Sequence, residues 1–315
     1  MIIYAVNIHT GGGKVLLDEL LINEPLGKIT ALFHDNRYVV PDVAKNKFYC
    51  YNTPPRLFSR MMAEFKLLRH LKLHGDQFVL FFGNMPPVFI SPPQSALYLQ
   101  NCFLLPNVRV ETDSLKTLLR LLVEKWLLKW RIHHVSEIWV QTNWMAEGLS
   151  SFKNLQVKKR PFLPSLPPPS YHDKQYDFIT VTSLAKHKNL KQLIEALQII
   201  ENHSNRKLSV LIVLDNTNSL AENEFSHFSN IKVTLLTNVQ RSDLLDLYQK
   251  SRCSIITSKA ESFSLPIYES LHFKLRVICP ALGYISEIQD RVISYNPNSA
   301  QDLAEKMLAE VSNFS

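Results

Sequence analysis

The sequence predicts an α/β protein of two domains, each with a parallel sheet covered by helices. Three observations lead to this prediction. The chain has 315 residues, enough for two domains at about 150 residues each. Short strand-like apolar runs alternate with amphipathic helical stretches in both halves, which is typical of parallel sheets with helices on both faces. Five prolines between Arg160 and Ser170 interrupt this alternation, and they cannot continue a helix or a central strand.

The first domain is predicted over residues 1–163, and apolar periodicity places its elements. A strand from Ile2 to Ile8 is followed by a glycine turn and a helix from Val15 to Leu21. The other strands of this domain are predicted at Ile29 to Phe33, Phe78 to Phe82, Ala96 to Leu99 and Glu137 to Gln141, and its other helices at Met61 to Leu73 and Asp113 to Trp130.

A proline-rich linker is predicted at residues 164–174, and the second domain at 175–315. Strands of this domain are predicted at Phe178 to Thr182, Leu208 to Leu214, Val233 to Leu236, Ser254 to Thr257 and Arg276 to Cys279. Helices are predicted at Leu190 to Glu201, Ser242 to Lys250, Pro266 to Phe273 and Ala300 to Glu310. We leave open that the last helix packs back on the N-terminal domain. Ligands of such sheets bind outside the carboxyl ends of the strands, so we expect a site in the cleft between the domains.

The composition limits the class of protein. Hydrophobic residues make up 46% of the chain and charged residues 20%, which argues against disorder. No apolar stretch reaches the ~18 residues of a spanning helix, and the first residues lack the features of an export signal, so we expect a soluble, cytoplasmic chain. The cysteines lack metal-ligand spacing and are expected to be reduced core residues; they are Cys50, Cys102, Cys253 and Cys279.

The formal charge of +7 is the sum of +8 in the first 170 residues and −1 in the rest of the chain, and this asymmetry points to an anionic partner. The stretch from Ser114 to Arg131 interleaves basic residues with leucines and two tryptophans, the pattern of an interfacial membrane helix. The alternative is that its apolar side packs against the sheet. The stretch from Arg56 to Lys72 adds further cations to the same domain. No nucleic-acid-binding motif accompanies the charge, so we expect an anionic membrane surface as partner and no nucleic acid.

Glycine is scarce in this chain. Of only eight glycines, three form the tripeptide Gly11, Gly12 and Gly13 at the predicted strand-to-helix turn. Bare backbone at a helix N-terminus can approach an anion closely. The spacing matches neither a nicotinamide-binding fingerprint nor a P-loop. An ordinary tight turn is the alternative.

The segment from Ser258 to Ser270 carries two carboxylates, Glu261 and Glu269. Pro266 suits the first position of a helix, and Ser264 or Ser262 can cap it. Glu261 then lies in a loop above the sheet edge and Glu269 in the helix, so both can face one pocket. Two carboxylates alone would also suit a glycosidase.

This segment resembles the Glu, seven residues, Glu motif of the retaining family 4 glycosyltransferases, which have the two-domain GT-B architecture. Flanking segments resemble the family in the same order. In the second half they are Val181 to Asn189 and Val233 to Tyr248. The segments Asn7 to Lys14, Phe82 to Pro87 and Leu99 to Asn101 resemble bacterial O-antigen and capsule members.

The resemblance implies that Glu261 and Lys188 are the catalytic residues of a nucleotide-sugar site. Glu269 would bind the ribose, Glu261 the sugar hydroxyls and Lys188 the diphosphate, which the glycine triplet would approach from the opposite domain. The implied donor-binding residues are Gly11, Gly12, Gly13, Ser183, Lys188, Asn238, Val239, Glu261, Ser262, Phe263, Ser264, Leu265 and Glu269. Fixed cations and backbone N–H groups stabilise a leaving diphosphate without a metal, and a UDP-sugar is favoured over a GDP-sugar.

The chain departs from the family pattern at several positions. Thr182 and Ser183 stand where the family has Gly-Arg, so one phosphate-binding cation is missing, for which Lys186 or Lys259 could substitute. Serines replace the glycines that flank Phe263. Lys274 and Arg276 stand where glycine and proline are common.

The polar residues that follow strand ends in the first half are acceptor-side candidates. They are His9, His34, Asp35, Asn84 and Asn101; the alternative is that they form local loop contacts. The sequence thus predicts a retaining transferase that moves a hexose to a hydroxyl of an O-antigen, capsule or lipopolysaccharide acceptor, at the inner face of the cytoplasmic membrane. A non-catalytic sugar-nucleotide-binding protein and a GT-B epimerase or phosphorylase are the alternatives.

Overall fold

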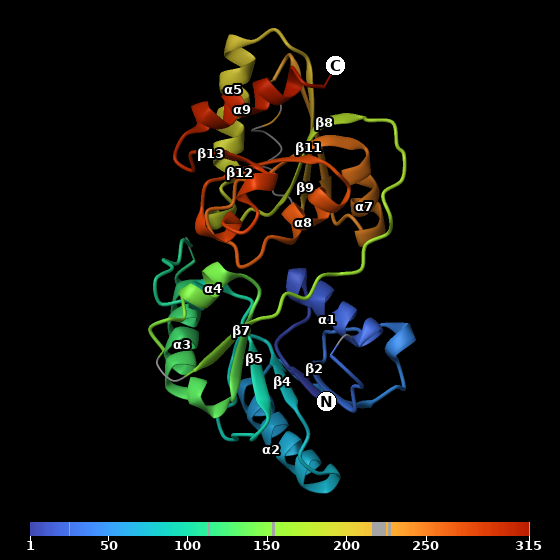
Figure 1. Ribbon diagram of the computed structural model, residues 1–315, viewed down its shortest axis with the longest axis vertical. Coiled ribbons are helices and arrows are strands. Elements are labelled where there is room, and N and C mark those ends of the chain that lie inside the picture. Colours follow the sequence, from blue (N-terminus) through green and yellow to red (C-terminus); the bar gives the residue numbers. More distant parts are fainter. Residues whose placement is uncertain (25, 113, 153–154, 216–224, 226–227, 315) are drawn as a thin grey trace. The chain divides into compact units, whose positions relative to one another are not determined.

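The computed structural model describes residues 1–24, 26–112, 114–152, 155–215, 225 and 228–314. It divides into two compact units, each with its own parallel sheet and helices (Figure 1). The first unit comprises Met1–Val110 and Ser114–Ser165, and the second comprises Glu111–Asp113 and Leu166–Ser315. The predicted α/β class with two parallel sheets is therefore confirmed.

The sheet of the first unit has seven parallel strands in the order β3-β2-β1-β4-β5-β6-β7. Its strands are β1 Ile2–Ala5, β2 Ala31–Asp35, β3 Tyr49–Thr53, β4 Val79–Phe82, β5 Ser95–Tyr98, β6 Glu137–Val140 and β7 Gln156–Lys159. The four residues of β1 are buried, because helices cover both faces of a parallel sheet. The chain order reverses between β1 and β4, which is where such sheets bind ligands.

Two helices of the first unit begin earlier than the sequence predicts, whereas the helix predicted from Asp113 begins at Leu115. They are α1 Gly11–Asn23, α2 Leu57–His74, α3 Leu115–Arg131 and α4 Asn143–Glu147, with short 3₁₀ helices η1 Asp42–Ala44, η2 Cys102–Leu104 and η3 Ile132–His134. The predicted glycine turn is wrong, since the triplet forms the first turn of α1. The first N–H groups of a helix have no partner within the helix, so glycine in this turn destabilises the helix less than glycine in its interior. Asp113, the predicted start of α3, lies outside the described residues.

The sheet of the second unit has six parallel strands in the order β10-β9-β8-β11-β12-β13. Its strands are β8 Tyr176–Thr182, β9 Leu208–Leu214, β10 Ile231–Thr237, β11 Ser251–Ile255, β12 Arg276–Pro280 and β13 Ile293–Tyr295. Its helices are α5 Leu190–His203, α7 Arg241–Gln249, α8 Leu265–His272 and α9 Ala300–Val311, with 3₁₀ helices η4 Lys186–Lys188, η5 Gly283–Ile285 and η6 Gln289–Arg291. The order reverses between β8 and β11.

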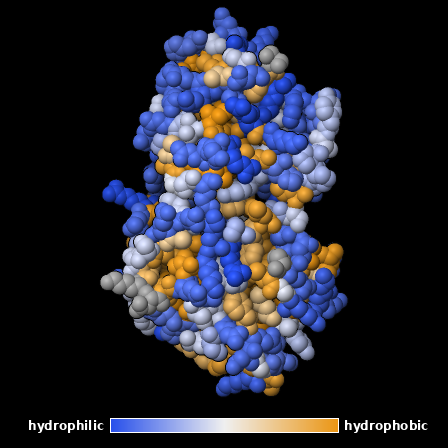
Figure 2. All heavy atoms as spheres, viewed as in Figure 1, coloured by the Kyte–Doolittle hydropathy of each residue, from blue (hydrophilic) through white to orange (hydrophobic). Residues whose placement is uncertain are grey.

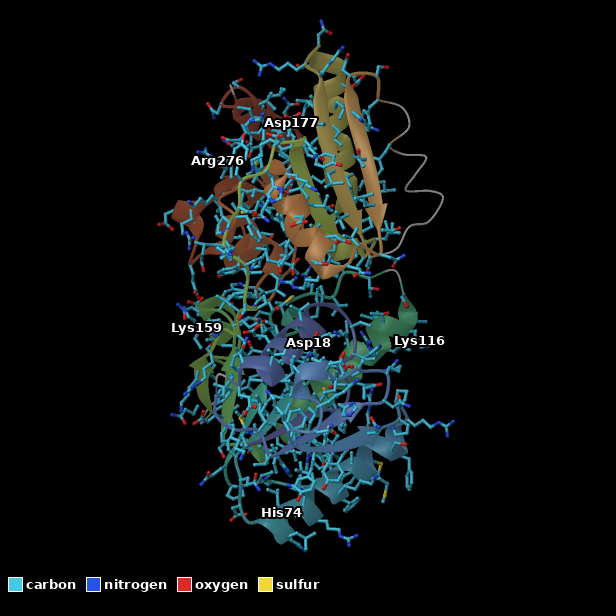
Figure 3. All side chains as sticks on the ribbon, turned by 90° about the vertical axis from the view of Figure 1, so that its right-hand side faces the viewer. Asp18, His74, Lys116, Lys159, Asp177 and Arg276 are labelled. Carbon is cyan, nitrogen blue, oxygen red and sulfur yellow. The ribbon has the colours of Figure 1, made fainter. Side chains whose placement is uncertain are left out.

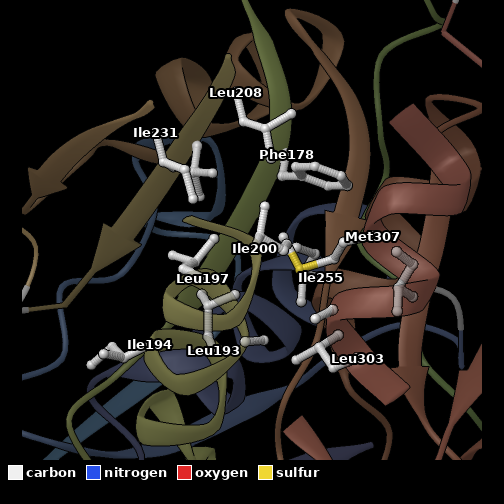
Figure 4. Packing of buried hydrophobic residues seen from close by; sticks show 14 of the residues in the cluster. Phe178, Leu193, Ile194, Leu197, Ile200, Leu208, Ile231, Ile255, Leu303 and Met307 are labelled. Atoms are coloured by element: carbon white, nitrogen blue, oxygen red, sulfur yellow. The ribbon is translucent and has the colours of Figure 1, made fainter. Parts of the chain in front are cut away.

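The core of the second unit lies on both faces of this sheet. On one face, Leu193 and Leu197 of α5 meet Leu303 and Met307 of α9 over the sheet residue Phe178 (Figure 4). The helix α9 thus belongs to the core of the second unit. Packing of this helix on the N-terminal domain is the possibility that the sequence leaves open. On the other face, α7 and the residues after α8 cover the sheet; this cluster contains Ile179, Leu211, Val213, Leu245, Tyr248, Phe273 and Leu275.

The four cysteines are free thiols. Cys102, Cys253 and Cys279 are buried as expected, but the expectation is wrong for Cys50, which is exposed. Cys50 lies on β3, the edge strand of the first sheet, where one side of the strand lacks cover. Among the described residues, no helix has both the length and the apolar character needed to cross a membrane.

Candidate functional site

Two loops of the second unit meet at the carboxyl ends of β8 and β11, the strands between which the chain order reverses. This is where doubly wound sheets place their ligands. A small pocket opens here. Its lining residues are Thr180, Val181, Thr182, Ile255, Ile256, Thr257, Ser258, Glu261, Ser264 and Pro266.

Lys188 and Glu261 form an ion pair at this pocket. The Nζ of Lys188 donates to Oε1 of Glu261 over 2.5 Å, and the two side chains are only 22% and 14% exposed. The structure therefore brings together the two residues that the sequence names as catalytic. A lysine and a carboxylate this close provide one group that can bind an anion and one that can bind hydroxyls.

The backbone of the two loops holds this pair in place. The hydroxyl of Thr257 donates to the carbonyl of Lys188 over 2.7 Å. The N–H of Lys259 donates to the carbonyl of His187 over 2.7 Å. Lys188 ends η4, and Asn189 after it adopts a left-handed conformation with φ 51°, which turns the chain into α5. Asparagine tolerates this conformation better than most residues, so the turn fixes the position of Lys188.

Glu269 lies on α8, where Arg241 binds it. The Nη2 of Arg241, at the start of α7, donates to Oε1 of Glu269 over 2.7 Å, and Glu269 is only 2% exposed. A buried carboxylate is costly without such a partner. Burial raises the pKa of the neighbouring Tyr248, and the charge of Glu269 raises it further. Glu261 thus lines the pocket, whereas Glu269 is not among the lining residues and is bound by an arginine.

Sequence reasoning missed Arg241. A signal was present, because a cation in the first turn of a helix opposes the helix dipole and needs a compensating anion. Arg241 also lies only two residues after the predicted donor residue Val239. Asn238 adopts a left-handed conformation with φ 52°, and Val239 packs against the apolar cluster under α7.

The segment before α8 differs from the prediction in its capping. Ser264 occupies the N-cap position, but its side chain makes no capping bond, and Pro266 is the second helical residue rather than the first. Ser264 has φ 59°, which points its hydroxyl away from the N–H groups that a cap in extended conformation reaches. Its Oγ is buried without a hydrogen-bond partner among the described residues. Phe263 is buried and stacks on Tyr268 with ring centroids 3.9 Å apart.

The other predicted donor residues lie near these elements. Leu265 is the first residue of α8, and Ser262 precedes Phe263 in the loop. The hydroxyl of Ser183 accepts a long bond of 3.4 Å from the N–H of Ala185 in the loop after β8. In the first unit, Gly11 and Gly12 are exposed in the first turn of α1, and Gly11 has φ 66°. The role of the triplet toward a diphosphate stays a prediction.

Most acceptor-side candidates of the first unit form local contacts. Burial opposes ionisation of Asp35, but hydrogen bonds from Arg37 outweigh it and lower the pKa of Asp35. Burial lowers the pKa of His34. The side chain of Asn84 accepts from the N–H of Gln100, and that of Asn101 accepts from the N–H of Phe103. His9 differs, because its Nδ1 is buried with no partner among the described residues.

Metal ligands do not gather in this site. In the described part of the chain, no group of three or more His, Cys, Asp or Glu side chains is arranged to hold a metal ion. The pocket is lined by Glu261, hydroxyl side chains and apolar residues, and Lys188 is paired with Glu261.

The family of the second unit follows from a comparison of the sequence with family models. Residues 167–313 match the family described as "Glycosyl transferases group 1". The second unit of the chain is thus similar to the glycosyl transferases of group 1. A search of the curated proteins finds no match.

Several solved structures share the fold of this chain. Sucrose-phosphate synthase from Thermosynechococcus elongatus aligns with TM-score 0.70 and 13% identity over 99% of this chain and 90% of its own. WaaG, a glycosyltransferase involved in lipopolysaccharide biosynthesis, aligns with TM-score 0.63 and 15% identity over 99% of this chain and 90% of its own. A third structure is a mutant of S. aureus TarM in complex with Fondaparinux, α-GlcNAc-glycerol and UDP. It aligns with TM-score 0.60 and 15% identity over 78% of this chain and 51% of its own, so the chain spans about half the length of TarM. These likenesses confirm the GT-B fold.

Proposed function

We propose that this glycosyltransferase moves a hexose, with retention of configuration, from a UDP-sugar to a hydroxyl of a surface polysaccharide acceptor such as O-antigen, capsule or lipopolysaccharide. The observation that carries the donor site is the Lys188–Glu261 pair at the pocket between the ends of β8 and β11. The UDP bound to TarM and the role of WaaG in lipopolysaccharide biosynthesis support the choice of donor and acceptor.

Lys188 neutralises the diphosphate of the donor. Negative charge develops on that diphosphate as the glycosidic bond breaks, and a fixed ammonium group stabilises it. Without donor, Glu261 balances the charge of Lys188, so neither group is left unpaired in a largely buried place. When donor binds, the diphosphate replaces Glu261 as partner of Lys188, and Glu261 accepts hydrogen bonds from hydroxyls of the transferred sugar.

The remaining donor contacts come from α8 and the loop after β10. Glu269 binds the ribose hydroxyls, and Arg241 holds its carboxylate group in position. The first N–H groups of α8 have no partner within the helix, so the segment from Ser262 to Leu265 can donate to the phosphates. Asn238 and Val239 contact the base.

The first unit binds the acceptor. Among the acceptor-side candidates we favour His9, because its buried Nδ1 has no hydrogen-bond partner among the described residues. In retaining transfer of this kind the acceptor attacks from the face that the diphosphate leaves, so the leaving phosphate itself can take the acceptor proton. We place the enzyme in the cytoplasm, at the inner face of the membrane that carries a lipid-linked acceptor.

Substitution of the pair tests the proposal. We expect Lys188→Ala and Glu261→Ala each to lower kcat with a UDP-hexose by about a hundredfold or more, the usual cost of removing one charge-stabilising group. Lys191→Ala is the matched control, because Lys191 lies exposed one turn away on α5. NMR of the product should show the anomeric configuration of the donor. Unchanged turnover in either variant, or donor binding with neither transfer nor hydrolysis in the parent enzyme, would contradict the proposal.

A further inference from the structure

Most of the large apolar side chains of α3 are exposed at the surface of the first unit. Leu121 and Leu128 are buried toward the first unit. Six larger apolar side chains on α3 are between 50% and 69% exposed; they are Leu115, Leu119, Leu122, Val123, Trp126 and Trp130. Packing against the sheet, the alternative considered for this stretch, therefore does not account for its apolar residues.

The exposed residues of α3 form one ordered face. At 100° per residue, the six apolar side chains fall within an arc of about 100°. Lys129 borders this arc on one side, and Lys116 and Arg120 border it on the other. Figure 3 shows Lys116 on the first turn of α3, at the outer edge of the first unit. Trp126 and Trp130 stack at the centre of the face, with ring centroids 5.3 Å apart. The face is thus apolar in the middle and basic along both edges.

The apolar surface continues beyond α3. The guanidinium of Arg131 lies 4.7 Å from the Trp130 ring and donates to the carbonyl of Val88. The next residue, Phe89, stacks on Phe65 of α2 with ring centroids 5.7 Å apart, and both rings are nearly half exposed. Figure 2 shows apolar side chains at the surface in the region where Figure 1 draws α3.

We propose that this face of α3 docks on an anionic lipid bilayer, with Trp126 and Trp130 in the interfacial region and Lys116, Arg120 and Lys129 against the headgroups. The proposal rests on the proposed function, since it identifies the surface on which a lipid-linked acceptor is met. Charge complementarity selects this occupant. The sole acidic residue of α3, Glu124, lies off the face and is paired with Arg120. The helix therefore has five cationic side chains and a single carboxylate to oppose them. Tryptophan and basic residues flanking an apolar arc are the features that hold a helix in the plane of a bilayer interface.

Vesicle co-sedimentation of the full chain tests the proposal. We expect binding to vesicles of equimolar phosphatidylglycerol and phosphatidylcholine, weak binding to phosphatidylcholine alone, and release as NaCl rises from about 0.05 M to about 0.5 M, because salt screens the headgroup charge. The variant Lys116→Gln, Arg120→Gln, Lys129→Gln should bind about a hundredfold more weakly, since each cation near an anionic surface contributes roughly fivefold. The matched control is Lys191→Gln, Lys207→Gln, Lys232→Gln, which removes three exposed lysines from the second unit and should bind as the parent does.

A second variant tests the apolar part of the face. Trp126→Ser with Trp130→Ser should weaken binding about tenfold or more, and both residues are exposed, so folding should be unaffected. Tryptophan emission of the parent should shift to shorter wavelength and be quenched by brominated lipid, and the double variant, which retains Trp139 and Trp144, should lose that response.

Three outcomes would overturn the docking proposal. They are equal binding of parent and tryptophan variant, equal binding to charged and zwitterionic vesicles, and a parent that sediments as a dimer without vesicle binding while the tryptophan variant is monomeric. The last would assign the face to a second copy of the chain. Donor binding and transfer to a soluble acceptor, measured on the same variants, report on the proposed function separately.

Discussion

Two residues of the second unit adopt a backbone conformation that glycine usually occupies. Ser264 and Lys274 stand where the family that the sequence resembles has glycine, and both adopt left-handed conformations with φ 59° and 60°. A side chain in this region costs about 1 kcal/mol or more relative to glycine. The fold therefore keeps the backbone conformation that glycine would favour, although the glycines are gone.

Lys274→Gly should stabilise the protein for this reason. Lys274 is exposed just after α8, so its side chain has little packing to lose. We expect a gain of about 1 kcal/mol and a rise in Tm of about 2 °C or more. Lys250→Gly is the matched control, because Lys250 also ends a helix but has φ −83°; that change should be neutral or lower Tm. A fall in Tm for Lys274→Gly would show that its conformation carries no strain.

The bond between Arg241 and Glu269 should be important for stability as well as for donor binding. Removing the guanidinium leaves a carboxylate that is 2% exposed without its cation. Arg241→Gln should therefore lower the free energy of unfolding by about 3 kcal/mol, as measured by urea unfolding. The double variant Arg241→Gln, Glu269→Gln removes the buried charge as well and should recover part of that loss. If the single variant unfolds at the same urea concentration as the parent, Glu269 has a source of compensation other than Arg241.

At the scale of elements, the sequence predicts the inner strands and the edge strand β10 but misses the other three edge strands. Strand β9 matches its predicted bounds, because a continuous apolar run identifies a strand buried on both faces. Strands β3, β7 and β13 were missed. Residues of β3 and β7 are largely exposed, so an edge strand lacks the apolar pattern by which inner strands are found, and β13 has only three residues.

The helix α9 should be needed for the second unit to fold. Its residue Leu303 is fully buried against α5 and the sheet. Leu303→Ala should lower the free energy of unfolding by about 3 kcal/mol, from lost burial and the cavity left behind. Glu305→Ala, on the exposed side of α9, should change it by less than about 0.5 kcal/mol. Equal effects of the two substitutions in urea unfolding would mean that α9 contributes little to this core.

At the scale of the molecule, the sequence predicts which loops lie together better than it predicts their side-chain contacts. Lys188 and Glu261 lie 73 positions apart in the chain and form a bond, as expected from two loops at the same sheet edge. The partner of Glu269 was not foreseen, because no periodicity shows that the start of α7 lies beside α8. The orientation of α3 was also left open, since its apolar residues suit a buried and an interfacial helix equally.

The two units, each with its own core, should unfold as separate transitions in calorimetry of the full chain. The proposed donor residues Lys188, Glu261 and Glu269 all lie in the second unit, so a bound nucleotide should shift the transition of that unit. UDP at about 100 times its Kd should stabilise it by about 2.7 kcal/mol. GDP, ADP and dTDP at the same concentration should shift it less, and UDP should have little effect on Lys188→Ala. If GDP shifted this transition more than UDP, the proposed donor base would be wrong while the site would stand; if no nucleotide moved either transition, the site itself would be wrong.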